Sequence, residues 1–179
     1  GVHHFGSHPN AELHAQPSHM PDQRAETVGV DLRRYPPVTQ AATIVYPADW
    51  NTLVAPPAPP TLACRYFDPE PITIPADPAT LTAAVMVKAD LTITYEDALA
   101  AATNQTAWNV LTQQPATVAG LPATRIEATS TAGSPGYPVG VTRYAYLIDA
   151  GGRPVWFETS GTIGDATYDT NKSVVDLMA

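Results

Sequence analysis

The sequence is poor in the residues that catalytic sites use most often. It contains one cysteine, Cys64, and its five histidines all lie at or before position 19. A single thiol cannot form an intramolecular disulfide, so the fold depends on its core rather than on covalent cross-links. Because no imidazole follows residue 19, the rest of the chain offers no partner for a Ser-His-Asp triad or a Cys-His pair.

Basic residues are scarce as well. Nine lysines and arginines stand against 17 aspartates and glutamates, which gives a formal net charge of −8. A chain of this charge repels phosphate backbones and has no basic stripe from which counterions could be released. Nucleic acid is therefore not an expected partner.

Several other signals are missing. No apolar run reaches about 18 residues, so we expect no transmembrane segment within this sequence. It also lacks a P-loop, a GxGxxG fingerprint, a CxxC pair and an HExxH motif, each of which brings its own cofactor or metal chemistry. We therefore expect no cofactor and no catalytic zinc.

Two regions of different composition make up the chain. Residues 1–40 are polar, rich in histidine and proline, and show neither strand nor helix periodicity, which predicts a disordered arm or leader. Its histidines lack the fixed geometry that a specific metal site requires. Residues 41–179 are expected to form a single domain. The last segment is predicted as a helix without a stop signal, so we expect the domain to be truncated at its C-terminus.

The patterning of residues 41–179 predicts many strands and few helices. Runs rich in β-branched and aromatic residues are typical of strands at 42–47, 61–67, 82–90, 108–120, 121–131, 141–149 and 153–161. Residues 48–55 are predicted as a turn or short helix. Helices are expected at 94–104, where Thr94 and Asp97 can form a capping box, and at 167–179. Hairpin connections between strands favour an antiparallel β-sheet with helices packed on it, an α+β domain.

Alternation along strands assigns side chains to faces. Within 141–149, Arg143 and Leu147 share one face, while Tyr144 and Tyr146 share the other. Both faces are partly apolar, so we expect both to be covered. By the same rule Cys64 lies on the face of its strand that also holds apolar side chains, which predicts a packed core or edge position rather than a nucleophile or lipid anchor.

Aromatic residues gather on the C-terminal strands and the loop before them. Such residues either fill the core beneath a helix or line a ligand groove. The candidate ligand-binding residues are Tyr137, Tyr144, Tyr146 and Trp156. Tyr137, which lies in a loop, is expected to be exposed.

Carboxylate pairs give no catalytic assignment. The neighbouring acidic residues are Asp68 and Glu70, Glu96 and Asp97, and Asp165 and Asp169. A turn before a proline explains the first pair, and helix N-termini explain the other two. No catalytic and no metal-ligating residue is therefore assigned.

Several phrases of the sequence resemble a known family. They are YPADW (46–50), CRYFDPEP (64–71), TVAGLPATRIEA (117–128), TRYAYLIDAGGRPVWFETSG (142–161) and the closing YDTNKSVVDLM helix. The chain resembles actinobacterial secreted proteins and lipoproteins of the LpqN type, whose domain is similar to the Mog1/PsbP-like fold. The resemblance implies an α/β/α sandwich around a seven-stranded or similar antiparallel sheet. It also implies a protein that acts by binding rather than by catalysis.

Together these observations favour a non-enzymatic extracytoplasmic binding domain of an actinobacterial protein. Its partner would be another protein or a small envelope ligand, and the domain would be secreted or lipid-anchored through a preceding segment. Two alternatives stay open. One is a carboxylate-dependent hydrolase using Glu158 and Asp149, and the other is an intracellular adaptor or chaperone of the same fold.

Overall fold

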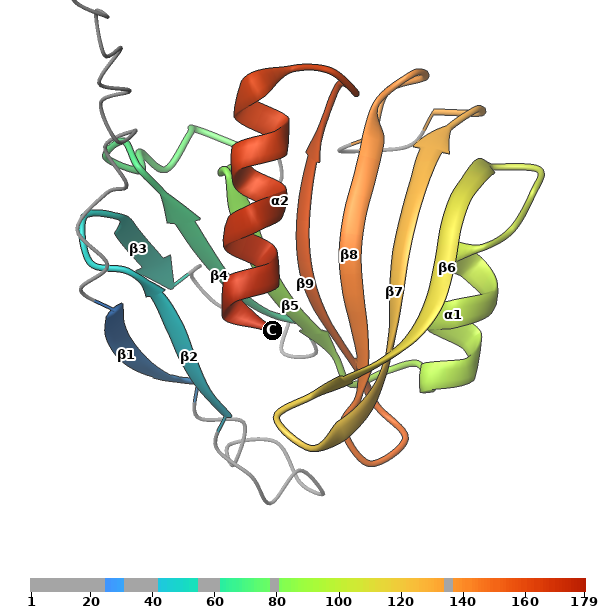
Figure 1. The fold of residues 1–179 in the computed structure, drawn as a ribbon, viewed down its shortest axis with the longest axis horizontal. Helices are drawn as coiled ribbons and strands as arrows, with labels where there is room; N and C mark the ends of the chain where they lie inside the picture. Colours follow the sequence, from blue (N-terminus) through green and yellow to red (C-terminus); the bar gives the residue numbers. More distant parts are fainter. Residues whose placement is uncertain (1–24, 31–41, 55–61, 78–80, 134–136) are drawn as a thin grey trace, which may run out of the picture.

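The computed structural model describes residues 25–30, 42–54, 62–77, 81–133 and 137–179. Its centre is a seven-stranded sheet in the order β3-β4-β5-β9-β8-β7-β6, in which every neighbouring pair is antiparallel (Figure 1). The strands are β3 (Asn51–Val54), β4 (Leu62–Asp68), β5 (Val85–Asp90), β6 (Trp108–Val118), β7 (Leu121–Ser130), β8 (Thr142–Asp149) and β9 (Pro154–Gly161). The predicted α+β class with an antiparallel sheet is confirmed.

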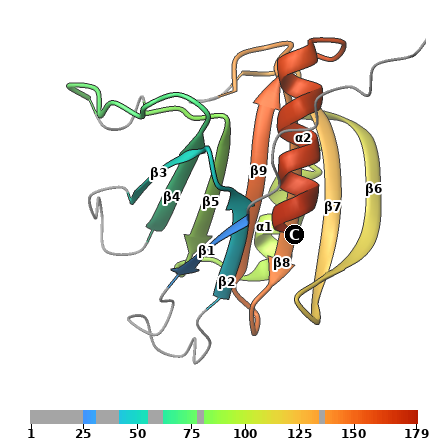
Figure 2. The same ribbon diagram turned by 60° about the vertical axis from the view of Figure 1, so that its left-hand side comes forward.

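The two helices lie on opposite faces of this sheet. Helix α2 (Ala166–Met178) packs on the face seen in Figure 1, together with a two-stranded antiparallel sheet of β1 (Ala25–Val30) and β2 (Ala42–Pro47). Helix α1 (Tyr95–Ala102) covers part of the opposite face, as the turned view in Figure 2 shows. On the α2 side neither of the two helices in the described part of the chain covers β6 and β7, because α2 lies over β5, β8 and β9 (Figure 1).

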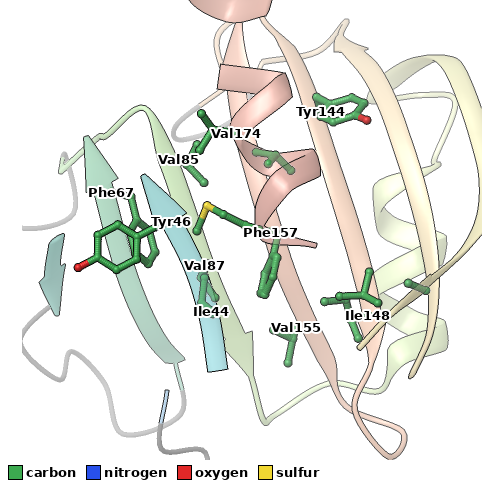
Figure 3. Close-up of a cluster of buried hydrophobic side chains, with 14 of the residues drawn as sticks. Ile44, Tyr46, Phe67, Val85, Val87, Tyr144, Ile148, Val155, Phe157 and Val174 are labelled. Carbon is green, nitrogen blue, oxygen red and sulfur yellow. The ribbon is translucent and has the colours of Figure 1, made fainter. Parts of the chain in front are cut away.

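The larger apolar core lies between the sheet and the layer of α2 and β2. Tyr46 of β2 packs onto Phe67 of β4, with ring centroids 5.1 Å apart, and Ile44 of β2 belongs to the same core (Figure 3). Val174 and Val175 come from the inner side of α2. Burial of these side chains fixes the helix and β2 on one face of the sheet.

A smaller core lies under α1. Ala98 and Ala102 are the buried residues of this helix, and their small side chains let it approach Ile126 and Leu147 on the sheet. The predicted N-cap at Thr94 is confirmed, whereas the second contact with Asp97 runs between the two side chains, with the Thr94 hydroxyl donating to Asp97 Oδ2 at 2.9 Å. Thr94 Oγ1 accepts a hydrogen bond from the backbone N–H of Asp97 at 3.1 Å, which satisfies a helix N-terminal donor.

Strand β8 has both of its faces covered, as the alternation predicted. Leu147 belongs to the core under α1, whereas Tyr144 and Ile148 belong to the core under α2. The turn that follows uses Gly151 and Gly152 at φ angles of 73° and 85°, where glycine avoids the strain of a side chain.

The structure corrects two predictions near the start of the domain. Residues 25–30 form β1, so the prediction that residues 1–40 have no regular structure is wrong for these six. Residues 51–54 form strand β3 at the edge of the sheet, where a turn or short helix was expected. The backbone of Cys64 lies in β4 opposite Lys88, but its side chain and the remainder of the arm fall outside the described residues.

Candidate functional site

A buried charged cluster lies on the α1 side of the sheet. Glu158 of β9 is 2% exposed, forms an ion pair with Lys88 of β5, and accepts a hydrogen bond of 2.6 Å from the Tyr137 hydroxyl. Strand register places Glu158 opposite Met86 and Ala145, in the middle of the sheet. Burial, followed by the negative charge of Glu158, raises the pKa of Tyr137, so its hydroxyl stays a donor.

Arg143 extends this cluster. Its guanidinium carbon lies 4.3 Å from the ring centroid of Trp108, 4.9 Å from that of Trp156 and 5.6 Å from that of Tyr137. One of its terminal nitrogens donates to the Ala102 carbonyl at the end of α1. Its Nε is buried without a hydrogen-bond partner in the part of the chain that the structure describes, so the aromatic faces supply most of its favourable surroundings.

We define the Glu158 cluster as Lys88, Tyr137, Arg143 and Glu158. The contacts of this cluster stabilise the α1 side of the sheet. Three of its members are less than a tenth exposed, and Lys88 is 25% exposed. The expectation that Tyr137 is exposed is wrong, because the residue is only 9% exposed and its ring packs edge-on against Trp108. A partner in solution therefore cannot use Tyr137 as an anchor without first moving it.

A second polar network lies on the α2 side and is more accessible. Helix α2 presents Tyr168, Lys172 and Asp176 at intervals of four residues, so the three share one flank. This flank meets β7 and β8 at the border of the area that α1 and α2, the two described helices, leave uncovered (Figure 1). The spacing of α2 thus puts three polar side chains in a row beside an open part of the sheet.

Two carboxylates join the helix to the strands. Glu127 Oε1 of β7 accepts hydrogen bonds from the Tyr168 hydroxyl at 3.0 Å and from Lys172 Nζ at 2.6 Å. Asp176 Oδ1 accepts hydrogen bonds from the hydroxyls of Tyr144 at 2.5 Å and Tyr146 at 2.9 Å. Burial and these hydrogen bonds raise the pKa values of Tyr144 and Tyr168, so both phenols remain protonated donors.

Cationic and amide groups complete the network on the open side. Arg125 donates a hydrogen bond to the Gln114 side-chain oxygen across β7 and β6. Its pKa is raised, mainly by electrostatic interaction with Tyr144 and against a smaller effect of burial. Lys172 Nζ lies 4.8 Å from the ring centroid of Tyr144. We call this set the α2 seam, and its members are Gln114, Arg125, Glu127, Tyr144, Tyr146, Tyr168, Lys172 and Asp176.

The four predicted ligand-binding residues divide between these two places. Tyr144 and Tyr146 lie in the α2 seam, with ring centroids 6.1 Å apart and nearly perpendicular planes. Tyr137 and Trp156 lie on the opposite face, beside Arg143. The structure therefore brings them together as two pairs and not as one groove.

Sequence reasoning missed the polar members of the seam. Lys172 is one of only two lysines in the chain, and its spacing from Tyr168 and Asp176 marks a helix flank. Glu127 and Arg125 carry no such local signal, because they reach the tyrosines only through the pairing of β7 with β8.

The carboxylates considered for hydrolysis have structural partners. Asp149 Oδ1 accepts the Gly152 N–H at 2.5 Å within the hairpin, and Asp149 pairs with Pro154. Glu158 lies four residues beyond Pro154 in β9, which corresponds to about 13 Å along the strand. Asp68 accepts two backbone N–H groups, and Asp165 is the N-cap of α2.

Within the described ranges, no three histidine, cysteine, aspartate or glutamate side chains converge as metal ligands. None of the helices that the structure describes has the length and apolar content needed to cross a bilayer.

Similar chains are found among the solved structures, including the following two. A protein of unknown function from Pseudomonas aeruginosa matches with a TM-score of 0.40 at 8% identity, over 86% of this chain and 95% of that one. Cyanobacterial PsbP from Synechocystis matches with a TM-score of 0.40 at 16% identity, over 76% of this chain and 82% of that one. No protein-family model and no curated sequence gave a match.

Proposed function

We propose that the domain is a non-enzymatic binding module that recognises its ligand through the α2 seam. We further propose that it belongs to an actinobacterial extracytoplasmic protein of the LpqN type and that its ligand comes from the cell envelope. The partner is a protein or a small envelope molecule. The proposal rests on one observation above all: accessible polar groups, among them Arg125, Lys172 and Asp176, lie beside an area of sheet that neither of the two described helices covers.

The difference in burial between the two polar networks supports this assignment. Glu158 and Arg143 are 2% and 7% exposed, so their polar atoms are engaged inside the domain. In the α2 seam, Gln114 and Asp176 are exposed, and Arg125, Tyr146 and Lys172 are partly exposed. The polar atoms of the Glu158 cluster therefore stabilise the fold, whereas the α2 seam has accessible polar groups that can bind a ligand.

The test is a nuclear magnetic resonance titration of the isotopically labelled 179-residue chain. Protein, polysaccharide and lipid fractions of an actinobacterial envelope are added separately, and amide chemical shifts are followed. We expect one fraction to shift the amides of Arg125, Glu127, Tyr146 and Asp176, because a ligand on the seam changes their surroundings.

Two results would contradict the proposal. One is the absence of any shift with all three fractions. The other is a set of shifts confined to the α1 side, around Trp108 and Trp156, which would move the binding surface to the opposite face. In the Arg125→Gln variant, the same concentration of the active fraction should cause smaller amide shifts than in the unchanged chain.

A further inference from the structure

We infer that the ligand of the α2 seam is a neutral oligosaccharide. This inference rests on the proposed function, because it names the chemical class of ligand for the same surface. Three properties of the seam carry it: its unused hydrogen-bonding atoms, its cancelling charges and its lack of an apolar centre.

The first property is the hydrogen-bonding capacity that remains. Within the described residues, every hydrogen bond to Glu127 goes to Oε1 and every one to Asp176 goes to Oδ1. The second oxygen of each carboxylate is therefore left as an acceptor, and the amide nitrogen of Gln114 is left as a donor. Sugar hydroxyl groups donate and accept at once, so a row of mixed donors and acceptors suits them.

The second property is charge. Arg125 and Lys172 are cations, Glu127 and Asp176 are anions, and they lie within one network, so their formal charges cancel. An anionic ligand would meet two carboxylates here, and a cationic ligand would meet two basic groups. A neutral ligand is repelled by neither the carboxylates nor the basic groups.

The third property distinguishes a sugar from a protein partner. Protein interfaces have a centre enriched in apolar and aromatic side chains and depleted of charge. The exposed large apolar residues in the described part of the chain are Val54, Ile74, Leu111, Val139, Ile163 and Leu177, and none of them is a member of the seam. Its accessible groups are charged and amide side chains together with the partly exposed phenol of Tyr146.

The length of the seam favours an oligosaccharide over a single sugar. The accessible members of the helix flank, Lys172 and Asp176, are separated by a rise of only about 6 Å. Across the sheet, Gln114 lies opposite Arg125 and Arg125 opposite Tyr146, so two strand spacings of about 4.8 Å separate Gln114 from Tyr146, which donates to Asp176. A ligand that contacts Gln114, Glu127 and Asp176 together must therefore span more than one ring.

The experiment titrates the labelled full chain with cellotriose, maltotriose and chitotriose, and with trigalacturonate as a charged counterpart. At least one neutral trisaccharide should shift the amides of Gln114, Arg125 and Asp176 below about 10 mM, which detects a Kd near 1 mM. Its affinity should change less than twofold between about 0.05 M and 0.5 M salt, because screening acts on net charge. Asp176→Asn should weaken binding about tenfold, and the exposed control Asp169→Asn should not.

Two outcomes would overturn the inference. The absence of seam shifts with every neutral trisaccharide would do so, and so would tighter, salt-sensitive binding of trigalacturonate. Neither outcome touches the proposed function, because seam shifts caused by an envelope protein or lipid fraction would still support binding there. If no envelope fraction shifts the seam amides either, both the proposed function and this inference are wrong.

Discussion

Replacing Glu158 by alanine is expected to destabilise the domain by about 3–5 kcal/mol, the usual cost of removing one partner of a buried ion pair. Glu158 is 2% exposed, and it alone among the cluster's charges is negative. Without it, Lys88 and the buried Arg143 remain as uncompensated cations, and Tyr137 loses its acceptor. Denaturant unfolding followed by circular dichroism measures the change in free energy.

Two further variants test this explanation. Glu70→Ala removes an exposed carboxylate from a loop and should change the free energy of unfolding by less than about 0.5 kcal/mol. The double variant Lys88→Met with Glu158→Met should recover part of the stability, because it removes the unpaired Lys88 charge, while Tyr137 and Arg143 still lack Glu158. If the double variant is as unstable as Glu158→Ala, the uncompensated charge of Lys88 is not the cause of the lost stability.

Replacing Phe67 by alanine is expected to cost about 3–5 kcal/mol, because it opens a cavity in a closed core. Phe67 is fully buried in β4, and its ring centroid is 5.1 Å from that of Tyr46 in β2. The loss should therefore fall on the contact between β2 and the sheet as well as on the sheet itself. Thermal and denaturant unfolding of the variant give the size of the effect.

The matched control for this variant lies on the neighbouring strand. Val54 of β3 is 60% exposed, so Val54→Ala should change stability by less than about 0.5 kcal/mol. If Phe67→Ala costs no more than Val54→Ala, then β2 does not pack on the sheet as described. Amide hydrogen exchange of residues 42–47 gives a local measure, which should rise in Phe67→Ala only.

Much of the fold could be predicted because its signals are local. Alternation in β8 separated Tyr144 and Tyr146 from Arg143, and the capping residues Thr94 and Asp97 marked the start of α1. Strand β3 was missed because three of its four residues are exposed and leave no alternating pattern. Strand β1 was missed because its own sequence has no strand pattern. It is stabilised by its pairing with β2 in a two-stranded ladder.

The candidate site could be predicted only in part, because tertiary pairing creates it. The sequence identified Tyr144 and Tyr146 as neighbours on one face. It could not show that β7 places Glu127 opposite Tyr144, or that α2 brings Lys172 and Asp176 to the same border. The loop position of Tyr137 indicated exposure, but its hydrogen bond to Glu158 holds it in the core.

The most direct test of the α2 seam as the binding surface compares two variants that each lose one polar contact, Arg125→Gln on the α2 side and Tyr137→Phe on the α1 side. Affinity for the active envelope fraction and free energy of unfolding are measured for both. Arg125→Gln should bind at least about tenfold more weakly, a loss of about 1.4 kcal/mol, with nearly unchanged stability. Tyr137→Phe should lose about 1.5–3 kcal/mol of stability, since it removes a hydrogen bond to a buried carboxylate, and keep its affinity. The reverse pattern would contradict the assignment of binding to the seam and of the Glu158 cluster to the fold.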